Sequence, residues 1–421
     1  MKPAAVLRRE WFGGLEVTLP DGRLSFMEAD SFHQRQAELA TGQTPASNVR
    51  VIDATRWGYP LLHDALSTPA GAYLELTYRC DAACTHCYAN AGKGRWEDEL
   101  SLQDIERLLH QLAEAGAYEI RLTGGEPTLR SDLPEILDII SETGMKVSLN
   151  THGCYGENML RRLLDKGVKD LRISIDGTEA VNDAIRGKGR YQAVLATLRR
   201  VASYNRTSDR PVDTTINVTL MTANRRCVRP LIELAGELGT RISFGLLRPA
   251  GRADVAQMLA PEDVVRVAME TEQARQSLGL TKRQVRINYD IFCESDLEPW
   301  RKPFPFDNSK CPIGTMSLGV TAAGRVVPCN YLALVDNGRW VGEDVRGRNV
   351  LDLWHHSEVL KLARQVRRSA CADCQYHRTK CNGGCPATAV VLKGELDGVD
   401  PYCIRNVPGA RFPMQSDQGG N

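Results

Sequence analysis

The chain has 421 residues, of which 42% are hydrophobic and 25% are charged, as in ordinary globular proteins. Its 53 basic and 52 acidic side chains leave a net charge of +1, which gives no support for binding to nucleic acid or to a membrane surface. No run approaches the roughly 18 apolar residues of a membrane span. Residues 1–9 also lack the long apolar region of a secretory signal, so we expect a cytoplasmic protein.

Residues 1–68 are predicted to form a small N-terminal module and a connector. Residues 15–19 alternate in polarity and are followed by a turn and a second apolar segment at 24–26, which predicts a β-hairpin. Residues 27–40 are predicted to be helical. The stretch from 43 to 70 is rich in Pro, Ser and Thr and is typical of a connector.

From residue 72 onward, short apolar strands alternate with amphipathic helices. The predicted strands are 72–77, 118–123, 146–150, 170–175, 213–221 and 241–246. The predicted helices are 102–115, 133–143, 158–166, 191–204, 229–238 and 261–278. Regular alternation predicts an α/β fold with a parallel sheet and right-handed crossovers. In such sheets the active site lies at the carboxyl ends of the strands.

Thirteen cysteines are many for a protein of a reducing compartment, where disulfides are disfavoured. Ten of them lie in two stretches, residues 80–87 and 311–403, and such clustering indicates metal ligation. Cys80, Cys84 and Cys87 follow the first predicted strand with the spacing C-x3-C-x2-C. Three thiolates suit a [4Fe–4S] cluster that keeps one iron open, because such clusters normally take four cysteines.

An incomplete zinc site is the alternative interpretation of these three cysteines, since zinc takes four ligands in structural sites. The nearest candidate for a fourth ligand is His86. It lies between two of the cysteines, where geometry disfavours ligation.

The second group of cysteines has a mixed spacing. Gly324 and Cys329 form a G-x4-C motif, and a C-x2-C-x6-C-x3-C motif follows from Cys371 to Cys385. The members of the group are Cys311, Cys329, Cys371, Cys374, Cys381, Cys385 and Cys403. The spacing alone also fits a zinc ribbon or knuckle.

The three cysteines, Tyr88 and the later Gly124-Gly125-Glu126-Pro127 together resemble the radical S-adenosylmethionine (SAM) superfamily, over roughly residues 70–405. The resemblance implies a partial (β/α)6 TIM-like barrel at residues 69–290. It also implies a [4Fe–4S] cluster at Cys80, Cys84 and Cys87, which reduces SAM to a 5′-deoxyadenosyl radical that abstracts a hydrogen atom.

The same resemblance implies which residues bind SAM at the strand ends. Ser174 and Asp176 share one face of their strand and suit the polar groups of SAM, although Asp176 also suits a helix N-cap. Leu246 is expected to contribute backbone groups to the adenine site. The full set is Tyr88, Gly124, Gly125, Glu126, Pro127, Asn150, Ser174, Asp176, Asn217 and Leu246.

Residues 291–405 resemble the SPASM extension, which binds two auxiliary iron–sulfur clusters. Its pattern implies a distal cluster at Cys371, Cys374, Cys381 and Cys403. It implies a proximal cluster at Cys311, Cys329 and Cys385, with Cys293 as a candidate fourth ligand. The spacer before Cys381 is six residues, where the family usually has five. Residues 406–421 are predicted to be a disordered tail.

The leading hypothesis is therefore an enzyme that modifies a ribosomally made precursor peptide oxidatively, by a crosslink, a thioether or a decarboxylation. The alternative is the same machinery acting on a small molecule or a cofactor or haem-like precursor, and a non-catalytic metal scaffold is disfavoured. Sulfatase maturases carry an Asp after the G-x4-C cysteine, and Asn330 stands here instead, so formylglycine formation is disfavoured. We expect an electron donor such as flavodoxin or ferredoxin.

Overall fold

The computed structural model describes residues 5–18, 23–41, 49–92, 98–287, 312, 314–335, 338–367, 369–374, 377, 383–403, 405 and 407. Three of the predicted ligands, Cys293, Cys311 and Cys381, lie outside these ranges, and so do residues 408–421 of the predicted tail.

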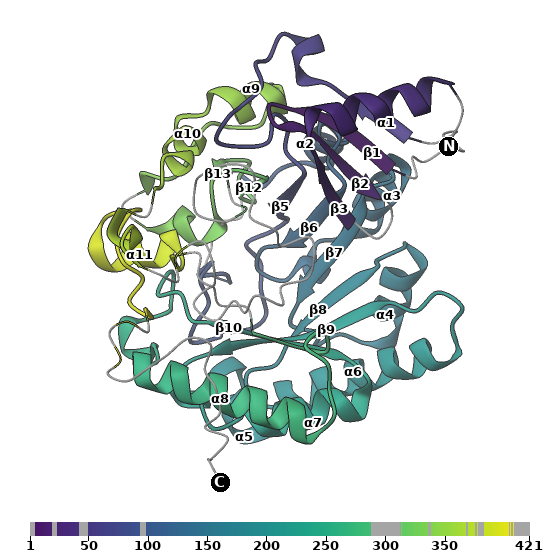
Figure 1. Cartoon of the computed structure of the whole chain (residues 1–421). Helices are drawn as coiled ribbons and strands as arrows, with labels where there is room; N and C mark the ends of the chain where they lie inside the picture. The colour runs from purple at the N-terminus through teal and green to yellow at the C-terminus, as the bar shows by residue number, and fades with distance from the viewer. Residues whose placement is uncertain are drawn as a thin grey trace.

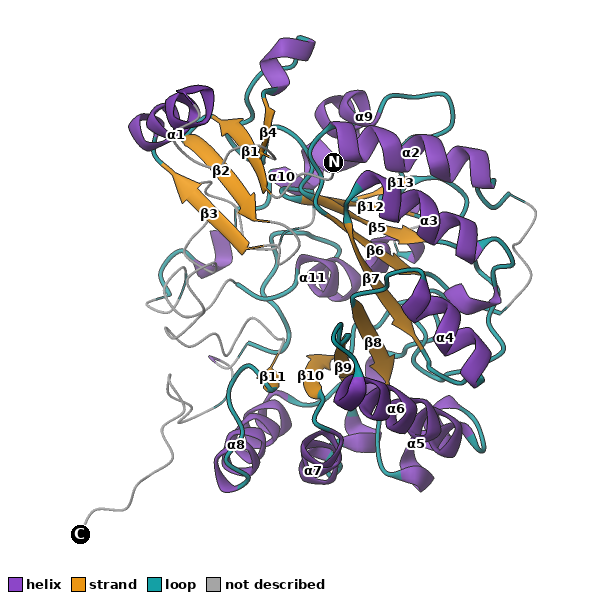
Figure 2. Cartoon of the chain, turned by 90° about the vertical axis from the view of Figure 1, so that its right-hand side faces the viewer, coloured by secondary structure: helices purple, strands orange, loops and turns teal. Residues whose placement is uncertain are grey.

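The N-terminal module is a four-stranded sheet with the order β3-β2-β1-β4, flanked by a helix (Figure 2). Its elements are β1 (Ala5–Glu10), β2 (Gly13–Thr18), β3 (Arg23–Met27), α1 (Ala29–Thr41) and β4 (Val49–Ile52). The predicted hairpin is formed by β2 and β3, which pair antiparallel. The sequence pattern missed β1 and β4. β4 lies in the predicted connector and pairs parallel with β1, so part of this connector belongs to the module's sheet.

The main sheet has nine strands in the described part of the chain, in the order β11-β10-β9-β8-β7-β6-β5-β12-β13. The six predicted strands are confirmed as neighbouring parallel strands. They are β5 (Gly71–Glu75), β6 (Glu119–Thr123), β7 (Lys146–Thr151), β8 (Asp170–Ser174), β9 (Asp213–Leu220) and β10 (Arg241–Leu246). The additional strands are β11 (Val285–Ile287), β12 (Ser317–Val320) and β13 (Val326–Val327).

The helices that follow these strands cover the outer face of the curved sheet (Figure 1). They are α2 (Leu102–Glu114), α3 (Leu133–Thr143), α4 (Glu157–Asp165), α5 (Glu179–Arg186), α6 (Arg190–Thr207), α7 (Val228–Leu238) and α8 (Pro261–Ser277). All except α5 were predicted. Ser101 caps α2 as part of a capping box, in which its Oγ accepts from the Asp104 amide at 3.2 Å.

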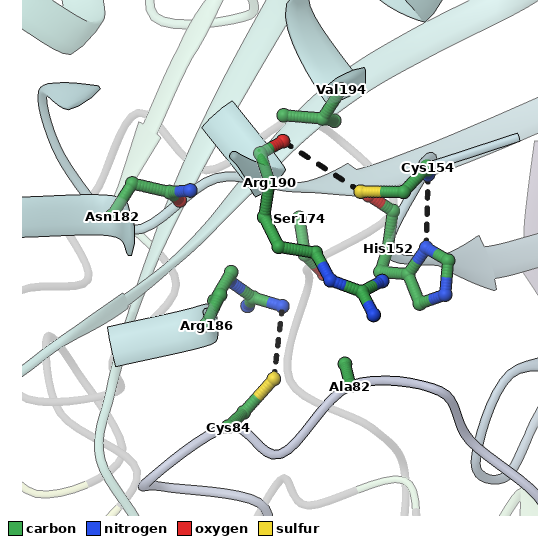
Figure 3. A pocket seen from close by; sticks show the side chains of 9 residues that line it. All are labelled: Ala82, Cys84, His152, Cys154, Ser174, Asn182, Arg186, Arg190 and Val194. Atoms are coloured by element: carbon green, nitrogen blue, oxygen red, sulfur yellow. Dashed lines mark hydrogen bonds between the residues drawn. The ribbon is translucent and has the colours of Figure 1, made fainter. Parts of the chain in front are cut away.

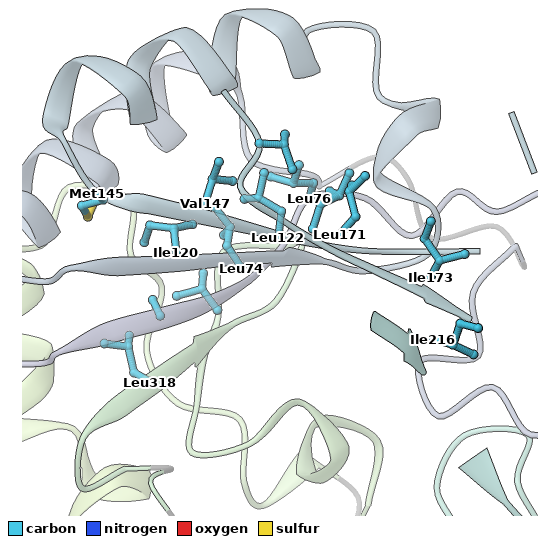
Figure 4. Packing of buried hydrophobic residues seen from close by; sticks show 14 of the residues in the cluster. Leu74, Leu76, Ile120, Leu122, Met145, Val147, Leu171, Ile173, Ile216 and Leu318 are labelled. Carbon is cyan, nitrogen blue, oxygen red and sulfur yellow. The ribbon is translucent and has the colours of Figure 1, made fainter. Parts of the chain in front are cut away.

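Apolar and polar residues alternate along the strands and so separate the two faces of the sheet. The apolar side chains, such as Leu74, Leu122 and Ile173, pack toward the helices in one core (Figure 4). The alternate strand positions, which face the inside of the barrel, carry polar side chains. Arg121, for example, lies 4.8 Å from the centre of the Tyr73 ring on the neighbouring strand. The inner face of the partial barrel is therefore polar up to the strand ends.

The cysteine-rich C-terminal region is joined to the barrel sheet, because β12 pairs parallel with β5. Its helices are α9 (Val350–His356), α10 (Glu358–Arg364) and α11 (Pro386–Lys393). In both views α11 lies on the side of the sheet opposite to α3 and α4 (Figures 1 and 2). Trp354 anchors α9, since its buried indole donates to the Leu66 carbonyl at 2.7 Å. No helix in the described ranges has the length and apolarity needed to span a membrane.

The capping box at α2 gives a test of the helix start. Ser101→Ala removes one half of the box and is expected to destabilise the protein by about 0.5–2 kcal/mol. Gln103→Ala in the same exposed turn is the control, and it is expected to change stability less. Urea unfolding followed by circular dichroism compares the two. Equal midpoints for the two variants would show that the cap contributes nothing.

Candidate active site at the cysteine loop

Cys80, Cys84 and Cys87 lie on the loop that follows β5, and all three are partly buried free thiols. The loop turns back on itself through two backbone hydrogen bonds, from Cys87 N to the Cys84 carbonyl and from Asn90 N to the Cys87 carbonyl. Burial raises the pKa of the Cys80 thiol to about 11. A metal must therefore displace protons to bind here.

The Gly124-Gly125 pair after β6 fastens this loop from one side. Gly125 N donates to the Thr77 carbonyl at 2.7 Å, and Glu126 N donates to the Arg79 carbonyl at 2.8 Å. A Cβ on Gly125 would lie 2.2 Å from the Arg79 carbonyl oxygen. These glycines thus permit a close approach to the cysteine loop.

The carboxylate of Glu126 is completely buried and is used within the protein. It accepts hydrogen bonds from Thr128 Oγ1 at 2.6 Å, from Thr151 Oγ1 at 2.8 Å and from His152 N at 2.9 Å. These bonds connect the loops after β6 and β7. The predicted SAM ligand Glu126 therefore has its side chain turned into the loop framework.

Asp81 holds the cysteine loop from a second side. Its Oδ1 lies 2.8 Å from His152 Nε2, and its Oδ2 lies 3.2 Å from Arg190 Nη2. Arg190 also donates to the Asp81 carbonyl. These partners were not found in the sequence, because nothing local to Asp81 indicates residues from the β7 exit and from α6.

Asp176 holds the loop from a third side. This residue is completely buried at the end of β8, and its Oδ2 lies 2.6 Å from Arg186 Nε and 3.2 Å from His86 Nε2. Its Oδ1 accepts from Thr219 N at 2.7 Å. Arg186 in turn points Nη1 at Cys84 Sγ at 4.0 Å (Figure 3). The predicted SAM ligand Asp176 thus has both oxygens engaged.

The segment after β10 closes the loop from a fourth side and was also missed in the sequence. Arg252 donates from its backbone N to the Cys87 carbonyl and from Nε to the Cys84 carbonyl, both at 2.9 Å. Gly251 has a φ of +66°, and a Cβ there would lie 2.2 Å from the Tyr88 carbonyl oxygen. A glycine five residues after the last predicted strand was the available signal.

A pocket lies beside Cys84 on the β8 side of the loop (Figure 3). Ser174, Asn182, His152 and Arg186 line part of it. Two buried polar atoms at this end of the sheet have no hydrogen-bond partner among the described residues, Asn150 Oδ1 and His86 Nδ1. Burial lowers the pKa of His86 to about 4, against the opposing effect of Asp176, so its ring is neutral.

These features fit a polar cofactor with both donors and acceptors, together with a three-thiolate cluster. Asn217 lies beside Ser174 in the register of β8 and β9 and is partly buried. The side chain of Leu246 packs into the core, so this residue offers only backbone groups. Cys80, Asp81 and His152 also place potential metal-binding atoms within 4.8 Å of one another, but His152 Nε2 is paired with Asp81.

A buried carboxyl group, Glu75, lies between this loop and the C-terminal region and was also missed. Burial raises its pKa to about 7, although the nearby Asn330 amide opposes the shift. Tyr88 packs beside it, with its ring 4.6 Å from that of Tyr331 and its hydroxyl 3.5 Å from Thr123 Oγ1. A Glu flanked by leucines at an inward strand position was the signal in the sequence.

The described cysteines of the C-terminal region fall into two groups. Cys329 and Cys385 pack in one cluster with Ala250 of the barrel. Cys374 raises the pKa of Cys403, after the larger effect of burial, so these two lie close together. Cys374 N also donates to the Cys371 carbonyl at 3.0 Å.

Comparison with known families gives two matches. Residues 74–235 match the radical SAM superfamily, and residues 311–375 match the SPASM iron–sulfur cluster-binding domain. A PqqA peptide cyclase of Xanthomonas campestris pv. campestris strain B100 is 30% identical over 351 residues, which cover 80% of this chain and 87% of that enzyme. A mycofactocin maturase of Mycolicibacterium smegmatis is 29% identical over 355 residues, covering 80% and 83%.

Solved structures show the same fold. Streptococcus suis SuiB bound to its precursor peptide SuiA superposes with a TM-score of 0.73 at 16% identity, covering 96% of this chain and 100% of that one. The enzyme anSMEcpe with bound AdoMet gives a TM-score of 0.62 at 17% identity, covering 80% and 91%. The chain therefore belongs to the radical SAM superfamily, as an enzyme with a SPASM domain whose cofactors are SAM, a [4Fe–4S] cluster and auxiliary iron–sulfur clusters.

Proposed function

We propose that the enzyme modifies a ribosomally made precursor peptide by an oxidative reaction. The observation that carries this proposal is the similarity to the PqqA peptide cyclase, whose name states a peptide substrate. The similarity extends over 351 residues and therefore includes more than the barrel that cleaves SAM. A small-molecule substrate is the second candidate, and we expect a flavodoxin or a ferredoxin as the electron donor.

We assign Cys80, Cys84 and Cys87 as the ligands of the [4Fe–4S] cluster. Together with SAM, this cluster supplies a 5′-deoxyadenosyl radical that abstracts hydrogen from the substrate. The protein's own part is to fix the loop. Gly125, Asp176 and Arg252 fasten it from beyond β6, β8 and β10, and Asp81 of the loop is held by His152 and Arg190.

The contacts revise the roles that we propose for the SAM-site residues. Asp176 and the Glu126 side chain act through other residues, because their oxygens are occupied within the protein. Asn150, Ser174 and His86 retain polar groups that can face SAM. Tyr88, Gly124, Gly125, Pro127, Asn217 and Leu246 remain proposed contacts.

For the SPASM domain, at residues 291–405 after a barrel at 69–290, we propose two auxiliary clusters. The packing of Cys329 with Cys385 supports the proximal set, which also includes Cys311 and the candidate Cys293. The closeness of Cys403 to Cys374 and Cys371 supports the distal set, which also includes Cys381.

Removing one of the three thiols tests the assignment of Cys80, Cys84 and Cys87 as cluster ligands. Cys84→Ala is expected to lose about four irons per chain and all SAM cleavage, because two thiolates do not retain a [4Fe–4S] cluster. Cys227→Ala, at a thiol buried in the core, is expected to keep its iron. Iron content and 5′-deoxyadenosine are measured after anaerobic reconstitution. Full iron content in Cys84→Ala would contradict the assignment.

The Asp176 side chain is expected to position the cysteine loop. Asp176→Asn keeps the shape but leaves Arg186 without its buried carboxylate, which costs about 3–5 kcal/mol when a buried pair is broken. We expect at least a tenfold loss of SAM cleavage, together with an altered electron paramagnetic resonance (EPR) signal of the reduced cluster. Asp138→Asn at the surface is the control. An unchanged EPR signal in Asp176→Asn would argue against a positioning role.

The substrate class is tested with reduced, reconstituted enzyme and SAM. The neighbourhood of the gene is first searched for a short reading frame, and a synthetic peptide of that sequence is expected to change mass in a reaction that consumes SAM. Formation of 5′-deoxyadenosine with an unchanged peptide, and consumption of a small molecule instead, would favour the second candidate.

A further inference from the structure

The segment that leaves β10, residues 247–252, lies between the two cysteine regions. We call it the exit segment. At its start, the Leu247 carbonyl accepts from the Tyr402 hydroxyl at 3.0 Å, and Ala250 packs with Cys329 and Cys385. At its end, Arg252 binds carbonyl groups of the Cys80–Cys87 loop. The exit segment thus touches both proposed cluster regions.

Arg248 of the exit segment has an unusual environment for an arginine. Its Nη1 atom is buried and has no hydrogen-bond partner, and its guanidinium makes no ion pair within the described ranges. Other arginines at the inner face are paired. Arg121 lies 3.1 Å from Glu119, and Arg186 lies 2.6 Å from Asp176.

Groups of the C-terminal region lie around Arg248. Ala250, two residues further on, packs with Cys329 and Cys385. Burial acts to lower the pKa of Arg248, but Cys385 and then Asp400 outweigh it and raise the pKa. The Asp400 carboxylate also accepts from Cys385 N at 2.6 Å and from Tyr402 N at 2.8 Å. An anion held by Cys329 and Cys385 would therefore lie close to the exit segment.

A partly buried cation is stabilised by a further anion placed beside it, because the attraction is stronger there than in bulk water. A cluster held by thiolates supplies negative charge at the position of Cys385. Net charge and hydrogen bonds near the sulfurs are among the factors that set the potential of such a cluster. A fixed cation favours the reduced form, which carries one more negative charge, and so raises the potential.

We propose that Arg248 is the counter-ion of the auxiliary cluster at Cys329 and Cys385 and raises the reduction potential of that cluster. The inference rests on the cysteine assignment made under the proposed function. It gives a residue of the barrel control over a cofactor of the SPASM domain.

The potential is measured in full-length protein in which Cys80, Cys84 and Cys87 are replaced by Ala, so that only auxiliary clusters contribute. EPR-monitored titration with dithionite is expected to give a lower potential for Arg248→Gln, by about 59 mV for each tenfold change in the one-electron equilibrium. Arg248→Lys keeps the charge and is expected to shift the potential less. Arg225→Gln, at a partly exposed arginine beyond β9, is the matched control and is expected to leave it unchanged.

Thermal unfolding gives a second readout that a packing role alone would not produce. Without iron, Arg248→Gln is expected to change the unfolding temperature little, because the cluster that Arg248 would face is absent. With clusters bound, it is expected to lower the unfolding temperature. An equal loss of stability in both forms would overturn the counter-ion role.

The assignment of the C-terminal cysteines and the role of Arg248 are tested by different outcomes. If the triple-Ala protein binds no iron, the assignment of the C-terminal cysteines is wrong. If it binds iron with normal spectra, and Arg248→Gln leaves the potential unchanged, the assignment stands and the role of Arg248 is wrong. A raised KM for the peptide, measured in an Arg248→Gln enzyme that keeps Cys80, Cys84 and Cys87, together with an unchanged potential would instead assign Arg248 to a substrate carboxylate and would also overturn the inference.

Discussion

The proposed cluster site depends on fixing the conformation of an irregular loop. The segment from Cys80 to Cys87 has no regular secondary structure of its own, so its shape comes from its neighbours. Backbone bonds from the Gly124-Gly125 turn and from Arg252, and side-chain pairs at Asp81 and Asp176, all converge on it. Most of the partners follow the ends of different strands, which a parallel sheet brings to one edge, and Arg190 comes from the start of α6. The geometry of the cysteine loop therefore depends on the correct folding of the whole sheet.

Buried charges give these attachments their rigidity. Asp176 is fully buried and yet satisfied, because an arginine, an imidazole and a backbone amide share its two oxygens. Such an arrangement is not a large source of net stability, since desolvation offsets much of the attraction. The arrangement fixes the position of the loop, because any displacement of the loop leaves a charge without its partner. The same reasoning makes Arg248 informative, because its buried Nη1 atom has no hydrogen-bond partner.

Local patterns in the sequence were sufficient for the six parallel strands and for the position of the cysteine loop at a strand end. They were insufficient for contacts between distant segments. The pairing of β12 with β5 joins residues that no local periodicity connects. The sequence also places Glu126 and Asp176 at the correct edge without saying which groups occupy their oxygens. Only the packed structure shows that both are turned toward protein partners.

The pairing of β12 with β5 also affects how the molecule assembles. Gly71, at the start of the strand that leads into the cysteine loop, is paired with Ser317, far later in the chain. Until that segment is synthesised, one edge of β5 has open backbone groups, and closing so long a loop is slow. The barrel sheet is therefore completed late, after the SPASM region has begun to emerge. The sheet that carries the cysteine loop therefore cannot form completely without a segment of the SPASM region.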